Sequence, residues 1–354
     1  MTATRNSAPI RVAQWATGAV GKTILRGVID RPGLELVGLY VYGDKKVGRD
    51  AGDIARRDTT GVIATRDIDE LIATKPQVVM HAPRLQVPYE KHDEDLLALL
   101  RAGINVITTA GQHFPRAHGS EREQMFLDAC HEGGSTLFGI GVSPGIVGER
   151  LALGLTGASM TLDAITIDEV LDARQMPDPD FAFTVMGMGS DPATLDGSGP
   201  LPTLYASLYL ETIAFMCERM GVKYDEVVAD HRVLPASEDL EVAAGHIGKG
   251  TVGSTEWRWH AMVNGKPFLT LAIIWTMEPE RPEYAGRDEW TIHFYGKPEM
   301  VVTLNMVEPD EPDSRTTAGQ YVTAGPALRA IEAVVDAPPG IFEPPVFAPF
   351  RMDS

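Results

Sequence analysis

Residues 12–22 decide the fold, and they read Val12-Ala13-Gln14-Trp15-Ala16-Thr17-Gly18-Ala19-Val20-Gly21-Lys22. A short apolar run leads to a turn with two glycines three residues apart. Apolar residues at helical spacing follow, up to Pro32-Gly33. The pattern predicts a strand, a glycine turn and a helix. A dinucleotide site needs this order, because Gly18 lets the backbone approach a pyrophosphate, Gly21 allows close helix packing and the helix N-terminus offers free N–H groups.

The match to the pattern G-x-G-x-x-G is partial, because Ala16 stands where the first glycine is usual. A bare strand-to-helix connection is therefore an open alternative. A second apolar strand over 34–42 follows directly and favours the dinucleotide site. The residues of the turn that we expect to bind the cofactor are Ala16, Thr17, Gly18, Ala19, Val20 and Gly21.

The end of the second strand bears on which nicotinamide cofactor binds. A site for NAD usually places an acidic residue there, to hold the ribose 2′-hydroxyl. Here Tyr42 ends the strand, and Gly43-Asp44-Lys45-Lys46 and Arg49 follow. We expect Tyr42, Lys45 and Lys46 to contact the cofactor, and the cationic residues favour NADP. NAD stays possible, because Asp44 is available to hold the ribose 2′-hydroxyl. In that case the basic residues of the turn are solvated surface charges.

Composition limits the class of protein. The 354 residues suffice for two domains, and the 44% hydrophobic and 23% charged residues are usual for a globular protein. The net charge of −18 and the lack of a long basic run argue against nucleic acid as a partner. Cys130 and Cys217 form no disulfide framework, and no cluster has metal-ligand spacing, so no metal is expected. The N-terminus, Met1 to Pro9, has no apolar targeting segment, and no stretch is apolar over membrane length, so we expect a cytoplasmic protein without membrane contact.

The first 150 residues alternate strands and helices, which predicts a Rossmann domain with a doubly wound parallel sheet in the α/β class. Ser120 and Glu123 have the spacing of a capping box, which predicts a helix up to Gly133-Gly134. Ligands of such sheets lie at the carboxyl ends of the strands. On this rule we add His81, Ala82, Pro83 and Thr109 to the expected cofactor contacts.

A second α+β domain, built on an antiparallel sheet, is predicted over 151–322. A long loop is expected over 176–202, then a helix over 204–220 and strands of period two. Asn264-Gly265 is typical of a hairpin turn. A helix over 326–335 and a tail, together 323–354, are expected to return to the Rossmann domain. Trp257, Trp259, Trp275 and Trp290 are interpreted as sheet packing, in the core or at a dimer interface.

Five segments of the chain are similar to one known family: RVAQWATGAVG (11–21), VGRDAG (47–52), NVITT (105–109), GIGVSPG (139–145) and GPALRAIEAVVDAPPG (325–340). The chain resembles the dihydrodipicolinate-reductase-like group, which includes 2,4-diaminopentanoate dehydrogenase and the NAD(P)H-dependent amine dehydrogenases. The resemblance covers the nucleotide half and the closing helix, whereas 155–320 match only in outline. It implies a Rossmann domain with an antiparallel-sheet domain, a nicotinamide cofactor and a homodimer.

The chain departs from that family in the loop after the fifth strand. The amine dehydrogenases use a glutamate there to handle the amine or iminium, but no carboxylate lies between Thr109 and Glu121. Gln112 forms hydrogen bonds but is no base, and His113 is suited to proton transfer near neutral pH. We expect both in the catalytic site, with Gln112 orienting the substrate. Phe114, Ser143, Glu169 and Asp172 are the candidate substrate contacts.

The sequence thus predicts an NAD(P)H-dependent oxidoreductase acting on a small C=N or C=O substrate, with hydride supplied by the cofactor. The proton is carried by His113 or by a carboxylate among Asp168, Glu169 and Asp172. Two alternatives stay open. One is a carbonyl or enone reductase without amine chemistry. The other is an NADP-binding protein without catalysis, which the missing glutamate keeps in consideration.

Overall fold

The computed structural model describes residues 8–176, 178–197, 199–285, 290–310 and 316–352. The chain divides into two compact units, of which unit 1 contains 1–146 and 307–345 and unit 2 contains 147–306 and 346–354. Residues 1–7, which make up most of the segment Met1 to Pro9 considered above for targeting, lie outside the described residues.

Unit 1 has a seven-stranded sheet whose paired strands all run parallel, in the order β15-β6-β5-β4-β1-β2-β3. The strands are β1 (Ile10–Trp15), β2 (Leu34–Tyr40), β3 (Ala64–Thr65), β4 (Val78–His81), β5 (Asn105–Thr108), β6 (Thr136–Gly139) and β15 (Gly340–Ile341). The helices are α1 (Ala19–Ile29), α2 (Ala51–Ala55), α3 (Ile68–Ala73), α4 (Asp93–Arg101), α5 (Ser120–Gly133) and α8 (Ala318–Val335). Short 3₁₀ turns η1 (Asp44–Lys46), η2 (Tyr89–His92) and η3 (Pro115–His118) lie between them. The predicted doubly wound parallel sheet is confirmed.

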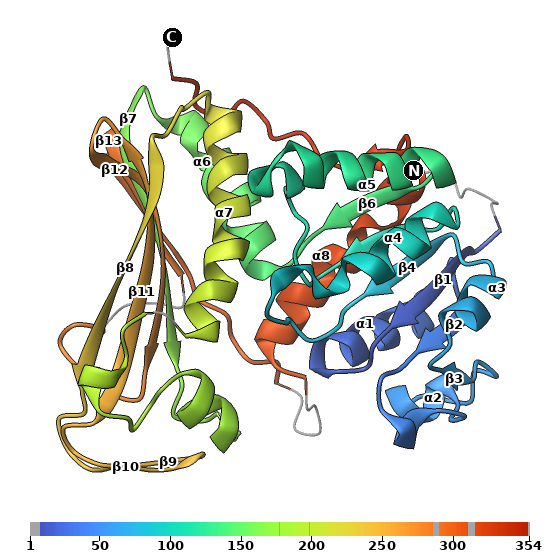
Figure 1. Ribbon diagram of the computed structural model, residues 1–354, viewed down its shortest axis with the longest axis horizontal. Coiled ribbons are helices and arrows are strands. Elements are labelled where there is room, and N and C mark those ends of the chain that lie inside the picture. Colours follow the sequence, from blue (N-terminus) through green and yellow to red (C-terminus); the bar gives the residue numbers. More distant parts are fainter. Residues whose placement is uncertain (1–7, 177, 198, 286–289, 311–315, 353–354) are drawn as a thin grey trace. The chain divides into compact units, whose positions relative to one another are not determined.

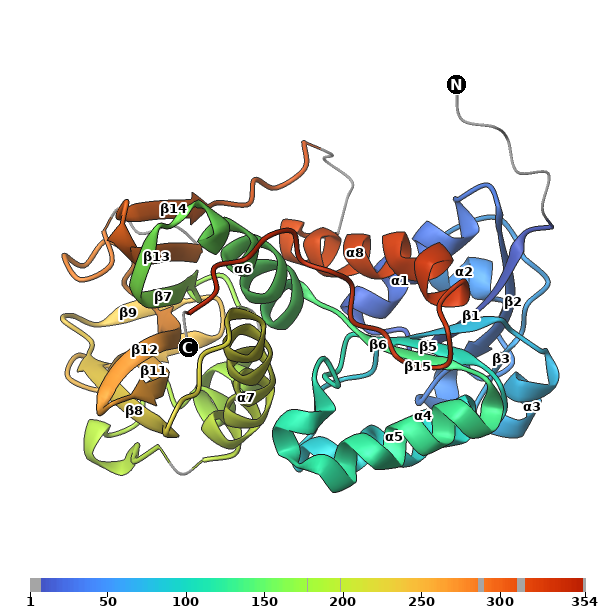
Figure 2. The ribbon, with the colours of Figure 1, turned by 90° about the horizontal axis from the view of Figure 1, so that it is seen from above.

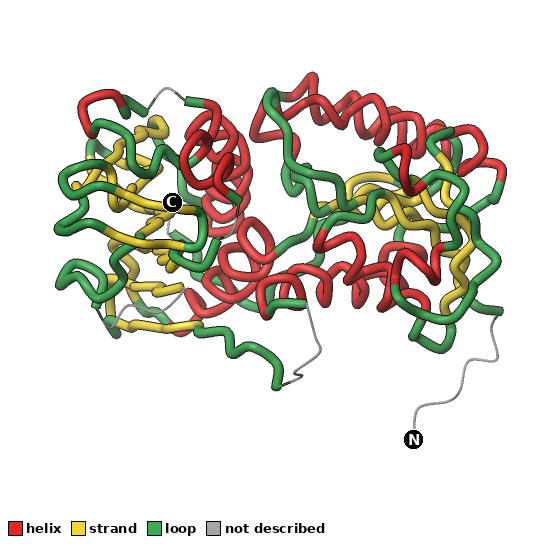
Figure 3. The backbone as a smooth tube through the Cα atoms, turned by 90° about the horizontal axis from the view of Figure 1, so that it is seen from below, coloured by secondary structure: helices red, strands yellow, loops and turns green. Residues whose placement is uncertain are grey.

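Helices cover both faces of this sheet, as Figures 2 and 3 show. Helices α1 and α8 lie on one face and α4 and α5 on the other. Each interface is an apolar core. Val12, Ile24 and Ile331 belong to the first, and Trp15 and Leu96 belong to the second. Residues of β1 thus enter opposite cores, which is why the strand carries apolar residues on both of its faces.

Unit 2 contains a six-stranded sheet in the order β14-β13-β7-β12-β11-β8 (Figure 1). The strands are β7 (Thr161–Asp172), β8 (Glu226–Pro235), β11 (Val252–Val263), β12 (Lys266–Thr276), β13 (Trp290–Lys297) and β14 (Met300–Leu304), and β9 (Leu240–Val242) pairs with β10 (Gly245–Ile247). The helical elements are η4 (Val142–Ala152), which begins in unit 1, α6 (Leu153–Leu155), η5 (Thr156–Ala158), η6 (Asp180–Val185), η7 (Pro192–Thr194) and α7 (Pro200–Met220). The sheet of the predicted second domain is antiparallel except at one pair, because β12 pairs in parallel with β7. The chain reaches β7 from the short helical segment η5, and no hairpin connects β7 to β12. The two strands are therefore not required to run in opposite directions.

The tryptophans pack against helix α7 on one face of this sheet. The ring centroids of Trp259 and Tyr209 lie 5.1 Å apart, and those of Trp275 and Tyr205 lie 5.9 Å apart. Trp257 is also buried on this face, and strand alternation puts Arg258 and its neighbours on the other. These three tryptophans are therefore core residues, which is the first of the two interpretations offered by the sequence.

Local signals also failed at a few element ends. Helix α5 begins at Ser120, with Gly119 at φ +114° in the cap position and no side-chain cap, so the predicted capping box is wrong. Ser120 is already helical there, and Glu123 pairs with Arg116 at 2.8 Å instead. The sequence also missed β8 and β15, which carry no clear pattern of their own because one is an edge strand and the other has two residues.

In the described part of the chain, no helix combines the length and the apolar character needed to cross a membrane.

Candidate cofactor and active site

The turn between β1 and α1 brings the helix very close to the strand. Ala16 adopts φ +70°, which turns the chain sharply after β1. A Cβ atom on Gly21 would lie 2.4 Å from the Ala16 carbonyl oxygen, so no other residue fits there without a backbone shift. The predicted role of Gly21 in close packing therefore matches the geometry.

Gly18 is different, because protein packing does not require glycine there. It caps α1 at φ −68°, which any residue adopts, and a Cβ on it would meet no protein atom within 4 Å. The open space lies at the helix N-terminus, where the first N–H groups lack intrahelical acceptors and the dipole favours an anion. The turn thus has the room and the donors that a pyrophosphate needs.

Gln14 supports this turn, and sequence reasoning missed it. Its buried side-chain amide donates to the carbonyl oxygens of Trp15 and Ala16, at 3.0 and 2.9 Å. These two bonds fix the backbone just before the glycines. A lone amide at an inward position of a buried strand is the signal that identifies such a residue.

The residues predicted to read the ribose end gather near the turn. Lys46 Nζ donates to the Thr17 carbonyl and hydroxyl oxygens, at 3.0 and 2.8 Å. Burial lowers the pKa of Lys46, and the nearby Lys22 and Arg49 lower it further, so several cations lie close together here. This concentration of positive charge suits a phosphate.

Asp44, the acidic residue available for a ribose 2′-hydroxyl, already has a partner in the protein. Asp44 forms an ion pair with Arg66, so its carboxylate is engaged in the structure. Tyr42 is 44% exposed, and its hydroxyl accepts a hydrogen bond of 2.9 Å from Trp15 Nε1. Burial of the hydroxyl raises the pKa of Tyr42 to about 12, so it acts as a neutral group.

The carboxyl ends of β4 and β5 place the remaining cofactor candidates at one edge of the sheet. His81 is fully buried, and its Nδ1 lies 3.0 Å from Thr108 Oγ1. Ala82 is buried and its N–H donates to the Trp15 carbonyl at 3.1 Å, whereas Pro83 is half-buried. The Thr109 N–H donates to the His81 carbonyl at 2.9 Å, which joins the two strand ends.

The loop after β5 is held by a buried polar network. Gln112 adopts φ +62°, and its amide Nε2 donates to Asp93 Oδ1 at 3.0 Å. Arg122 binds both Asp93 (2.7 Å) and Gln112 Oε1 (3.3 Å). Burial raises the pKa of Asp93, and Arg122 opposes the rise. The Gln112 N–H donates to the Tyr89 hydroxyl, which fixes the backbone as well. Gln112 thus has structural partners, in addition to the substrate role predicted from the sequence.

His113 follows Gln112 at this carboxyl edge. A Cβ on Gly139, the last residue of β6, would lie 2.6 Å from the His113 backbone nitrogen, so the loop packs tightly on the end of β6. Phe114 is buried, with the Arg116 guanidinium 4.6 Å from its ring centroid. Ser143 is half-buried in the segment after β6.

The candidate acids of unit 2 are separated by the geometry of β7. Glu169 lies in register with Ile273 and Trp290, and Asp168 with Ala272 and Thr291, so the two carboxylates face opposite sides of the sheet. Asp172 pairs with Arg174 at 2.7 Å. A single pocket therefore cannot receive both Asp168 and Glu169.

Comparisons with known proteins agree with this architecture, although no family model matches the chain. An amine dehydrogenase of Streptomyces virginiae is 29% identical over 345 residues, which is 94% of this chain and 95% of that protein. The solved structure of an amine dehydrogenase from Mycobacterium smegmatis has a TM-score of 0.72 at 19% identity, over 95% of this chain and 96% of that one. GenD2 from gentamicin A biosynthesis, solved with NAD, has a TM-score of 0.54 at 16% identity, over 94% and 88%. These similarities confirm the predicted fold and support the predicted class, an NAD(P)-dependent oxidoreductase.

The two glycines of the turn give a contrasting pair of variants. Gly18→Leu fills the open space, so we expect NADPH affinity to fall by more than about tenfold. The melting temperature should be nearly unchanged, because a Cβ atom at position 18 meets no protein atom within 4 Å. Gly21→Leu collides with the Ala16 carbonyl and is expected to lower the melting temperature, since overpacking costs about 1–3 kcal/mol. Fluorescence titration with NADPH and thermal unfolding measure both effects. A folded Gly18→Leu protein with unchanged affinity would place the site elsewhere.

Proposed function

We propose that this protein is an NAD(P)H-dependent oxidoreductase of the dihydrodipicolinate-reductase-like and amine dehydrogenase type, which reduces a small C=N or C=O substrate. The observation that carries the proposal is the turn of β1 and α1, which combines a required glycine at Gly21 with open space at Gly18. The similarity to the Streptomyces virginiae amine dehydrogenase along almost the whole chain supports it. The bound cofactor supplies the hydride. Loss of NADPH absorbance with a panel of carbonyl compounds, with and without amines, tests the activity.

We propose NADPH as the preferred cofactor. Lys46 lies on the glycine turn with Lys22 and Arg49 nearby, whereas Asp44, the acid available for a 2′-hydroxyl, is paired with Arg66. A ribose 2′-phosphate provides the anion that this cluster lacks. NAD remains the alternative cofactor.

Replacing both lysines tests the preference. In Lys45→Gln/Lys46→Gln, we expect the Kd of NADPH to rise about tenfold or more, because a charge-assisted phosphate contact contributes about 1.5–3 kcal/mol. The Kd of NADH should change little. Lys75→Gln, an exposed lysine of the same unit, is the matched control. Equal losses for both cofactors would show that the lysines do not bind the 2′-phosphate.

We propose that His113 carries the proton. Its loop is fixed at the carboxyl edge of the sheet through the backbone contacts of Gln112 with Tyr89 and Gly139. The family's loop glutamate is absent, and the nearest carboxylate in contact with the loop, Asp93, is bound to Arg122. The same absence supports the second candidate, reduction of a carbonyl or enone without amine chemistry. A protein that binds NADP without catalysis is the third.

Substitution of the histidine tests this role. His113→Ala is expected to lower kcat by about 10²- to 10⁴-fold, the usual contribution of general acid–base catalysis, with little change in the Kd of NADPH. His131→Ala, on the exposed side of α5, is the control and should retain full activity. A fully active His113→Ala enzyme would move the role to Asp168, Glu169, Asp172 or a water molecule.

We propose a homodimer formed through the uncovered face of the unit 2 sheet. Within the described residues, Figure 1 shows helix α7 on one face of this sheet and no helix on the other. Val228, Tyr295 and Val301 project from the uncovered face and are 38%, 37% and 58% exposed. Exposed apolar side chains on one sheet face are typical of an interface.

Light scattering tests the dimer. We expect a mass of about twice the 38.4 kDa of the chain at micromolar concentration. Tyr295→Glu combined with Val301→Glu should shift the mass toward the monomer, because it buries charge in the interface. A monomer mass for the unmodified protein would exclude this proposal.

A further inference from the structure

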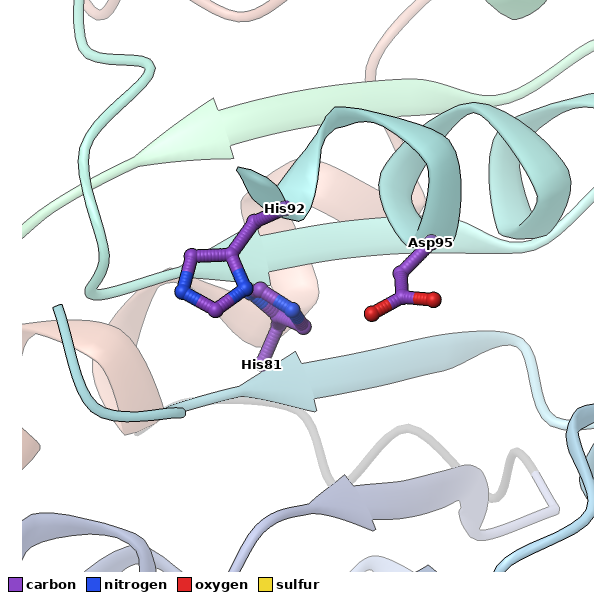
Figure 4. Close-up of side chains that lie close together, drawn as sticks. All are labelled: His81, His92 and Asp95. Atoms are coloured by element: carbon purple, nitrogen blue, oxygen red, sulfur yellow. The ribbon is translucent and has the colours of Figure 1, made fainter. Parts of the chain in front are cut away.

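Three side chains with metal-binding atoms meet in unit 1, and the mechanism proposed above uses none of them as a reacting group. His81 ends β4, His92 ends η2, and Asp95 lies in the first turn of α4. One ligand atom of each lies within 4.8 Å of those of the other two. Figure 4 shows the two imidazole rings next to each other, with the Asp95 carboxylate extending toward them from helix α4.

Both imidazoles are oriented by a hydrogen bond at one nitrogen only. His92 Nε2 lies 2.9 Å from the Arg84 carbonyl oxygen, so it carries the hydrogen, and in the neutral ring Nδ1 keeps a lone pair. Figure 4 shows that the His92 nitrogen nearer the ring's attachment faces His81. His81 Nδ1 contacts Thr108 Oγ1, whereas its buried Nε2 has no hydrogen-bond partner among the described residues. Metal-binding histidines have this arrangement, with the second nitrogen tied to a carbonyl or hydroxyl group.

The cluster is rich in acceptors and poor in positive charge. Burial holds the pKa of His81 well below its usual value, because a charged ring would lose its hydration there, and His92 nearby lowers it further. Burial also raises the pKa of Asp95, which His92 opposes, and Asp95 forms no ion pair within the described residues. Its neighbour Asp93 is neutralised by Arg122, so the two acids of one helix turn have different environments.

We propose that His81, His92 and Asp95 bind one divalent transition metal ion, with Zn²⁺ as the best fit. Two imidazoles and one carboxylate are a common Zn²⁺ ligand set, and nitrogen ligands disfavour Mg²⁺ and Ca²⁺. Bonds of about 2.0–2.2 Å put tetrahedral ligands about 3.4 Å apart, so the present separations, which are within 4.8 Å, close by at most about 1.4 Å. Asp95 is half-buried and has no hydrogen bond among the described residues to break, so its carboxylate supplies most of the movement.

The ion would close the chain between β4 and α4 into a short loop. His81 and His92 stand at the two ends of residues 82–91, and this segment carries Tyr89, whose hydroxyl holds the Gln112 backbone. Binding of the metal would therefore rigidify the loop that carries His113. The site is structural in this account and does not depend on the proposed reaction. It replaces the prediction of no metal, which rested on spacing alone. The pattern His92-x-x-Asp95, one turn apart on a helix, is the signal that was missed.

Metal titration of the whole protein tests the proposal without any activity measurement. After treatment with a chelator, Co²⁺ is expected to bind with one equivalent per chain and to produce the visible absorption of nitrogen- and oxygen-coordinated Co²⁺. Zn²⁺ should displace it and raise the melting temperature. Failure to bind a saturating equivalent of either ion at micromolar concentration would overturn the proposal.

Single variants assign the ligands. Asp95→Asn and His92→Gln should each weaken Co²⁺ binding by at least about tenfold, since even loss of an outer-shell partner costs about 10- to 100-fold. Asp95 is the safest position, because the side chain has no hydrogen bond in the described structure whose loss would disturb folding. Glu94→Gln, exposed on the same helix turn, and His131→Gln are the controls and should bind as the unmodified protein does. Equal binding in Asp95→Asn, His92→Gln and the controls would show that the ion binds elsewhere.

Discussion

The close approach of α1 to β1 is the constraint on which the structure of unit 1 depends. Gly21 leaves no room for a Cβ atom next to the Ala16 carbonyl, so the helix axis is fixed against the strand end. This contact points the free N–H groups of α1 at the carboxyl edge of the sheet. It also positions α8, because a Cβ on Gly27, further along α1, would collide with Leu328. Glycine at positions 21 and 27 thus determines the geometry of the candidate cofactor turn and the packing of α8 on α1.

A second constraint fixes the loops that surround the candidate active site. Four residues, Gln112, Asp93, Arg122 and Tyr89, join the loop after β5, the start of α4 and the first turn of α5 by hydrogen bonds and a salt bridge. In such a buried network each residue restricts the geometry of the others. A glutamate at position 112 would put a second carboxylate next to Asp93, which would repel it. A glutamate is therefore unsuited to position 112 in this network.

Much of the fold follows from local sequence, because strands, helices and glycine turns are determined by residues near one another. The turn of residues 16–21 and the hairpin at Asn264-Gly265, whose two residues adopt positive φ, are examples. The parallel pairing of β12 with β7 and the short strand β15 depend on contacts across more than 90 residues, which no local pattern encodes. The candidate site divides in the same way. Gly18 and Gly21 were evident from spacing, whereas Gln14, Asp93 and the pair of His81 with His92 become visible only when folding brings their partners together.

The two acids in the first turn of α4 show why the fold leaves a position for a cation. The helix dipole favours Asp93 and Asp95 alike, but an exposed or partly buried acid gains only about 0.3–2 kcal/mol from it. Each buried polar group without a partner costs about 1–3 kcal/mol. Among the three proposed ligands this cost falls on the buried Nε2 of His81, which has no hydrogen-bond partner among the described residues, whereas the Asp95 carboxylate is half-buried. Arg122 reaches Asp93 from α5 and pairs with it. At Asp95 the proposed ligands are one carboxylate and two imidazoles, and each imidazole offers a lone pair once its other nitrogen carries the hydrogen. A single metal ion satisfies all three at once.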